Sequence, residues 1–125
     1  MYPYISVIVN CHNGEKYLES CLNSIVNQNY KDYEVIIWDN ASTDNSKKIV
    51  KKFKDKKIKY FRHPIKENLY MARNRAIEVS SGQLIAFLDC DDWWDCNYLS
   101  SRKKFFNNND YDVFYNNVLS FYEKN

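Results

Sequence analysis

The stretch that decides the fold is Leu84–Asp95, LIAFLDCDDWWD, in which five apolar residues run directly into a dense group of acids. A continuous apolar run of this length is typical of a strand that is covered on both faces, as in a parallel sheet. Carboxylates follow at Asp89, Asp91, Asp92 and Asp95. Because carboxylates this close repel one another, we expect them to share a cation.

The segments before this stretch alternate between short apolar runs and helical patterns. The apolar runs predict strands at Ile5–Val9, Glu34–Trp38 and Ile58–Phe61, and a last strand is expected at Tyr111–Val118. Helical spacing predicts helices over residues 15–29, around 49–53, from 69 to about 80, and from 94 or 95 to about 106. This alternation predicts one α/β domain over residues 1–125, with a mostly parallel sheet flanked by helices.

The composition narrows the class of protein. The chain has 125 residues, enough for one core, and its net charge of +2 gives no indication of nucleic-acid binding. Only 2 glycines are present, so a glycine-rich phosphate loop is hard to build. The four cysteines form no C-x-x-C pair, and no signal pattern or membrane-length run occurs, so we expect free thiols in a cytoplasmic protein.

A basic segment lies at Lys47–Lys59, KKIVKKFKDKKIK. The simpler interpretation is a solvated helix face and the turn that follows it. The sharper alternative is a contact with anionic lipid headgroups, which would place the protein at the inner face of a membrane as a peripheral protein.

Polar residues follow three of the predicted strands, at the point where each strand ends. In open parallel sheets, ligands bind beyond the carboxyl ends of the strands, so these residues predict one polar cleft. They are Asn10, Cys11, His12 and Asn13 after the first strand, Asp39 and Asn40 after the second, and Asp89, Asp91 and Asp92 after the fourth. A hard divalent cation, Mg²⁺ or Mn²⁺, bound by one or two of the carboxylates and by ligand phosphates, would neutralise this charge.

One residue of this cleft, Asp39, and one residue of the third predicted helix, Arg73, have competing interpretations. Asp39 could form a turn or cap a helix, but Ser42 and Thr43 are the better cap candidates, so Asp39 could instead accept a hydrogen bond from a nucleobase imide. Arg73 shares the inward face of its helix with Leu69. It could pair with Asp39 or with a base carbonyl, and the sequence does not choose.

Two long stretches carry a resemblance to a known family. Residues 5–46, ISVIVNCHNGEKYLESCLNSIVNQNYKDYEVIIWDNASTDNS, resemble the opening of family 2 glycosyltransferases with the GT-A (Rossmann-like) fold, and Asn68–Asp92 resembles their later N-x-x-x-A-R-N to D-x-D-D segment. Together the two stretches cover most of residues 4 to 95, and their order and spacing are far more specific than any single motif.

The resemblance implies a role for each matching residue. The first loop, at Cys11, His12 and Asn13, would lie against the nucleotide of a nucleotide-sugar. Asp39 would bind the nucleobase, and Arg73 would lie near the nucleotide.

The acidic pair has an implied role of its own. Asp89 would meet the ribose or a metal-bound water, and Asp91 would bind the Mg²⁺ or Mn²⁺ on the diphosphate. Asp92 matches an acidic neighbour that is common in the family.

The chain departs from the family pattern in several places. Asn10 stands where proline is usual, His12 replaces tyrosine, and Asn40-Ala41 replaces Asp-Gly. The acceptor-binding half of such enzymes is also absent from these 125 residues. We therefore expect a truncated chain that carries the nucleotide-sugar-binding part, with the catalytic base beyond residue 125.

The resemblance implies that the intact enzyme transfers a sugar, with inversion, from a nucleoside-diphosphate donor to a glycan or lipid-linked acceptor, in polysaccharide biosynthesis. A UDP-linked donor is the first expectation. One alternative is a module that binds nucleotide-sugars without turnover. Another is a metal-dependent phosphotransferase with Asp89 as its nucleophile, for which the sequence shows no convincing partner residues.

Overall fold

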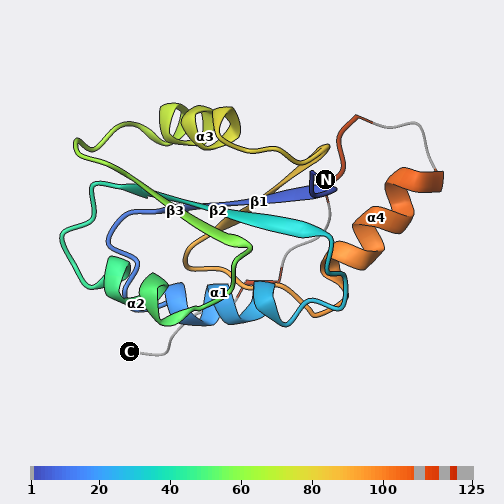
Figure 1. Ribbon diagram of the computed structural model, residues 1–125, viewed down its shortest axis with the longest axis horizontal. Coiled ribbons are helices and arrows are strands. Elements are labelled where there is room, and N and C mark those ends of the chain that lie inside the picture. Colours follow the sequence, from blue (N-terminus) through green and yellow to red (C-terminus); the bar gives the residue numbers. More distant parts are fainter. Residues whose placement is uncertain (1, 109–111, 116–118, 121–125) are drawn as a thin grey trace.

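The computed structural model describes residues 2–108, 112–115 and 119–120. Within these residues, strands and helices alternate along the chain (Figure 1). The elements are β1 (Ile5–Cys11), α1 (Leu18–Val26), β2 (Tyr33–Asn40), α2 (Ser46–Lys52), β3 (Ile58–His63), α3 (Leu69–Glu78), β4 (Leu84–Asp89) and α4 (Tyr98–Asn108).

The strands form one parallel sheet in the order β3-β2-β1-β4. The helix α3 covers one face of this sheet, and α1 and α2 cover the other (Figure 1). This arrangement confirms the predicted α/β class, because parallel neighbours require crossover helices that cover the faces. The central strands β1 and β2 are buried at every position, as their unbroken apolar runs predict.

The core consists of two layers, one on each face of the sheet. Alternate residues of β1 point to opposite faces, so Val7 and Val9 pack toward α1 while Ile8 packs toward α3. The α3 layer is thin because the helix presents Ala72 and Ala76, both fully buried, to the sheet.

Several predicted boundaries need correction. The strands β1, β2 and β4 run on through polar residues to Cys11, Asn40 and Asp89, because ladder pairing continues there. Helix α1 begins only at Leu18, and α4 begins at Tyr98. The strand expected at Tyr111–Val118 does not form within residues 112–115, and residues 111 and 116–118 lie outside the described part of the chain.

The lysines of α2 are exposed while Ile49 and Val50 are buried, as the simpler interpretation of the basic segment predicts. No helix in the described residues has both the length and the apolar character that crossing a bilayer requires.

A carboxylate ties the strands together at the amino-terminal end of the sheet. Glu34, in β2, is 3% exposed and accepts hydrogen bonds from Ser6 Oγ (2.6 Å), Ser81 N (2.6 Å) and Lys59 Nζ (2.6 Å). Burial acts to raise the pKa of Glu34, but these hydrogen bonds outweigh burial and lower the pKa to about 2. Gly82 N in turn donates to Ser6 Oγ at 2.8 Å. Glu34 is therefore a buried anion whose acceptors are in use.

Candidate functional site

The carboxyl ends of three strands lie side by side, as the sequence predicts. In the ladder register, Cys11 of β1 is opposite Asp39 of β2, and Asn10 of β1 is opposite Asp89 of β4. The strand β1 thus lies between the strand that carries Asp39 and the strand that leads into the acidic segment.

A cavity of about 350 Å³ opens at this edge of the sheet. It is lined by residues of the β1–α1 loop, the start of α3 and the end of β4, namely Asn10, His12, Asn13, Gly14, Tyr17, Leu69, Asp89, Cys90 and Asp91. Four of the residues to which the resemblance assigns a role therefore meet in one cavity: His12, Asn13, Asp89 and Asp91. Three others, Cys11, Asp39 and Arg73, are not part of its lining.

The acidic segment is held on one side by an arginine. Arg73 Nη2 donates to Asp89 Oδ1 at 3.0 Å, and the guanidinium carbon lies 5.3 Å from the centre of the Phe87 ring. Arg73 therefore pairs with Asp89 and not with Asp39, and its contact with a base carbonyl stays a prediction. The side chain of Asp89 stays 50% exposed, so its second oxygen can still accept.

The remaining charge at this edge is poorly compensated. Burial, then the charges of Asp91 and Asp89, raise the pKa of Asp92. Among the described residues, no three His, Cys, Asp or Glu side chains are arranged to hold a metal by themselves. Two cavity carboxylates do fit Mg²⁺ or Mn²⁺, since such ions commonly take one or two carboxylates and complete their shell with phosphate oxygens and water.

Asp39 occupies a structural position. Its side chain is 1% exposed; Oδ1 accepts from Ser42 N at 2.7 Å, and the Tyr60 hydroxyl donates to Oδ2. Burial and this bond to Asp39 raise the pKa of Tyr60. The expectation that Ser42 and Thr43 cap the next helix is wrong, because α2 begins at Ser46 with Asn45 at its N-cap. Asp39 forms the turn instead, and its contact with a nucleobase stays a prediction.

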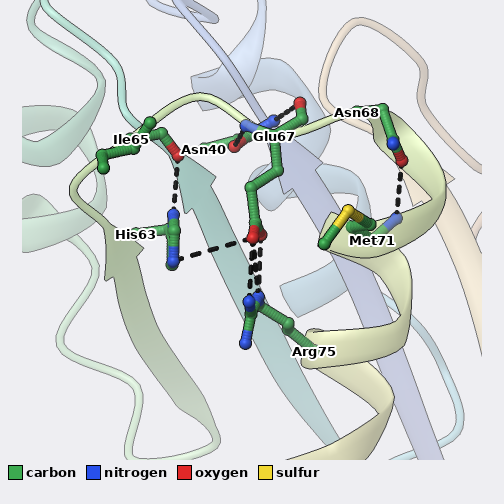
Figure 2. Close-up of polar contacts among 7 residues, drawn as sticks. All are labelled: Asn40, His63, Ile65, Glu67, Asn68, Met71 and Arg75. Carbon is green, nitrogen blue, oxygen red and sulfur yellow. Dashed lines mark hydrogen bonds and ion pairs between the residues drawn. The ribbon is translucent and has the colours of Figure 1, made fainter.

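Asn40 also has its polar atoms in use (Figure 2). Its Nδ2 donates to Glu67 O at 2.8 Å, and its Oδ1 accepts from Glu67 N at 2.8 Å. The Glu67 carboxylate in turn accepts from Arg75 at 2.8 to 3.0 Å and lies 3.8 Å from His63 Nε2. An aspartate at position 40 could not donate to Glu67 O, so the asparagine fixes the loop between β3 and α3.

The β1–α1 loop is held in place by hydrogen bonds. His12 Nδ1 lies 2.8 Å from Asn40 O, and Asn13 Oδ1 accepts from Thr43 N at 2.8 Å. Asn13 has a φ of 51°, a left-handed conformation that asparagine tolerates better than most residues. The cavity wall is therefore formed before any ligand arrives.

Two thiols lie beneath this loop. A Cβ added to Gly14 would come within 2.9 Å of Cys11 Sγ and 3.0 Å of Cys90 Sγ, so both sulfurs face the glycine. A hydrogen bond with Cys90 lowers the pKa of Cys11 to about 7, and the same bond raises the pKa of Cys90. Cys11 is 2% exposed and packs under the loop, as a small buried thiol would.

Sequence reasoning missed four residues of the cavity lining, which are Gly14, Tyr17, Leu69 and Cys90. Asn10 was predicted for the cleft from its place after the first strand, and the structure pairs it with Trp38 and Asp89 in the ladders and places it in the cavity lining. Gly14 and Cys90 directly adjoin predicted site residues in the chain, which is the signal that could have identified them.

Comparison with known families identifies the chain. The sequence model described as "Glycosyl transferase family 2" matches residues 6–125. The chain belongs to glycosyl transferase family 2. The resemblance carried by its sequence motifs is thereby confirmed.

Curated family 2 relatives are similar over nearly the whole chain. Glycosyltransferase GlyA of Streptococcus pneumoniae is 36% identical over 95% of this chain. The Escherichia coli enzyme WfgD, named a UDP-Glc:alpha-D-GlcNAc-diphosphoundecaprenol beta-1,3-glucosyltransferase, is 32% identical over 90% of it. The chain spans 17% of the first relative and 45% of the second.

Solved structures share the fold. Staphylococcus aureus TarS, residues 1–349 in complex with UDP, has a TM-score of 0.80 and 30% identity, covering 84% of this chain and 32% of that one. A mannosyltransferase from Pyrobaculum calidifontis, in complex with GDP-Man and Mn²⁺, has a TM-score of 0.77 and 25% identity, covering 83% of this chain and 32% of that one. These neighbours place the sheet in the GT-A class.

Proposed function

We propose that the protein transfers a sugar from a nucleoside-diphosphate sugar, UDP-linked in the first instance, to a glycan or lipid-linked acceptor. The observation that carries the proposal is the cavity at the carboxyl edge of the sheet, which contains the carboxylates Asp89 and Asp91. Support also comes from the TarS structures with UDP and UDP-GlcNAc, and from WfgD, whose name gives a UDP-sugar donor and a lipid-linked acceptor.

In this proposal Asp91, with Asp89, holds Mg²⁺ or Mn²⁺, which when bound offsets the charge that develops on the departing diphosphate. Arg73 positions Asp89 through the 3.0 Å bond between them. His12 and Asn13 form the wall along which the nucleotide lies.

Two other proposed site residues, Cys11 and Asp39, lie outside the cavity lining. Cys11 supports the loop from below. Asp39 is the proposed nucleobase partner, which requires it to exchange one of its present hydrogen bonds.

Residues 1–125 would thus form the nucleotide-sugar-binding part of the enzyme. The base that deprotonates the acceptor, and the inversion that a direct displacement produces, would depend on a part of the protein outside these residues. Peripheral contact with an anionic membrane surface through the exposed lysines of α2 is a further prediction.

The metal assignment is tested by Asp91→Asn. Calorimetry with UDP should show Mn²⁺-dependent binding for the unaltered protein and a loss of at least about 100-fold in the variant, because one metal ligand becomes neutral. Asp55→Asn, the same change at the opposite edge of the sheet, is the matched control and should bind normally. Retention of Mn²⁺-dependent UDP binding by Asp91→Asn would refute the assignment. Release of sugar from UDP-sugars by the unaltered protein then separates an enzyme from a module that only binds.

A further inference from the structure

Unpartnered donors gather at one place on the α3 side of the sheet. Among the described residues, the buried side-chain nitrogens without an acceptor are Asn10 Nδ2, Trp38 Nε1, Arg73 Nε and Arg102 Nε. The first three belong to one neighbourhood. Asn10 and Trp38 are opposite each other in the β1–β2 ladder, and Arg73 bonds Asp89, which is opposite Asn10 on β4.

The three donors also face the same side of the sheet. Residues two apart on a strand share a face, so Asn10 lies on the face of Ile8, which packs against α3 together with Trp38. A buried donor left without an acceptor costs about 1–3 kcal/mol. A ligand can supply the missing acceptor only to a donor that it can reach.

Asn10 is the one of the three that reaches the cavity. It is 9% exposed, it belongs to the cavity lining, and its Nδ2 has no partner. Trp38 and Arg73 are not in the lining. A ligand in the cavity would therefore meet the amide of Asn10 first.

We propose that Asn10 determines specificity by donating a hydrogen bond from Nδ2 to a neutral oxygen of the bound nucleoside, either a ribose hydroxyl or a base carbonyl. This inference rests on the proposed function. A neutral acceptor is favoured because Asp89 is the register neighbour of Asn10 and Asp91 lies in the same cavity, so a bare anionic oxygen would be repelled.

The contact would depend on a departure from the usual family pattern. The proline that is usual at this position in the family has no side-chain donor, whereas the carboxamide has two N–H groups. The Asn10 carboxamide would thus favour nucleotides that carry an acceptor oxygen at this place, whereas a proline would not distinguish them.

The test is calorimetric titration of UDP, in the presence of Mn²⁺, into the unaltered protein, Asn10→Ala and Asn10→Asp. Asn23→Ala, on the exposed face of α1, is the matched control. We expect Asn10→Ala to weaken UDP binding roughly 2- to 10-fold, the value of one hydrogen bond. Asn10→Asp should weaken it further, because the donor becomes an acceptor with a charge beside Asp89.

Two further nucleotides locate the acceptor. If Nδ2 bonds the ribose 2′-hydroxyl, the loss in Asn10→Ala disappears with 2′-deoxy-UDP. If it bonds O4 of the uracil, the loss disappears with CDP. A loss that persists with all three nucleotides supports another neutral oxygen of the nucleoside.

The ligand-free protein gives a second readout that a structural role would not produce. Removing an unpartnered buried amide should leave the thermal unfolding midpoint of Asn10→Ala unchanged or higher, while UDP binding falls. Equal UDP affinity in Asn10→Ala and the unaltered protein would overturn the inference alone. A lower midpoint in the ligand-free variant would also count against it, because it assigns Asn10 to the fold. If the unaltered protein binds no nucleotide, both the inference and the proposed function fail.

Discussion

The two ends of the sheet differ in how they accommodate buried and exposed carboxylates. At the amino-terminal end, Glu34 is 3% exposed and its carboxylate accepts hydrogen bonds from three neighbouring residues. At the carboxyl end, Asp89 is half-exposed and bonds Arg73, while Asp91 and Asp92 are exposed and form no ion pair with any residue that the structure describes. The charge of Glu34 is compensated by hydrogen bonds within the protein. The charges of Asp91 and Asp92 are not compensated in this way by the described residues.

This difference also appears in the direction of the pKa shifts. Hydrogen bonds hold the pKa of Glu34 at about 2, so ionisation of Glu34 stabilises the fold. Burial and neighbouring acids raise the pKa of Asp92, so ionisation of Asp92 destabilises it. A carboxylate whose oxygens accept hydrogen bonds thus stabilises the fold, whereas the mutually repelling acids support the proposal that a cation or ligand binds at the carboxyl end.

The largest effect we expect concerns the glycine at each end of the sheet. A Cβ at Gly82 would lie 2.5 Å from Ser6 N and 2.8 Å from Ile5 C, and this backbone cannot move away. Gly82→Ala should therefore lower the free energy of unfolding by about 3 kcal/mol or more. The atoms nearest to a Cβ at Gly14 would be side-chain atoms, the sulfurs of Cys11 and Cys90 at 2.9 and 3.0 Å, so Gly14→Ala should cost about 1–2 kcal/mol.

Urea unfolding of both variants measures this difference. Both glycines are replaced by the same residue, so each variant is the control for the other. Equal losses, or a larger loss at Gly14, would show that the amino-terminal end is not the more rigidly packed of the two.

Much of this architecture was predictable from the sequence. Unbroken apolar runs identified the buried parallel strands, and the polar residues after them identified the edge that carries the site. Side-chain partners were not predictable, because they depend on which element lies above each strand. Arg73 therefore pairs with Asp89, and Asp39 is enclosed by Ser42 and Tyr60, although local spacing gave no sign of either contact.

A smaller effect is expected from Glu34→Gln, which keeps the shape of the side chain but removes its charge. The amide retains one acceptor oxygen and turns a donor toward Lys59, which can move into water because its side chain is 47% exposed. We expect a loss of about 2 kcal/mol in the free energy of unfolding near neutral pH, from weaker hydrogen bonds to Ser6 and Ser81.

The pH dependence identifies the cause. The advantage of Glu34 over glutamine should be complete above its ordinary pKa of 4.5 and should disappear as the pH falls toward about 2. Urea unfolding of both proteins across this range measures it. A difference that does not change with pH would mean that packing, and not charge, stabilises this end.

The smallest effect should be of opposite sign, at the other end of the sheet. Asp92→Asn removes one of the mutually repelling acids and should raise the free energy of unfolding at neutral pH by about 0.5 kcal/mol, a small gain because Asp92 is exposed and water screens its charge. The raised pKa of Asp92 means that its penalty is absent below 3.8 and grows as the pH rises above that value. The extra stability of Asp92→Asn should therefore appear as the pH rises. The stability difference at Glu34 also grows with pH, but there the charged residue is the more stable one. A variant that is less stable than the unaltered protein at pH 7 would show that Asp92 makes a stabilising contact, and that the acids at this edge are not in conflict.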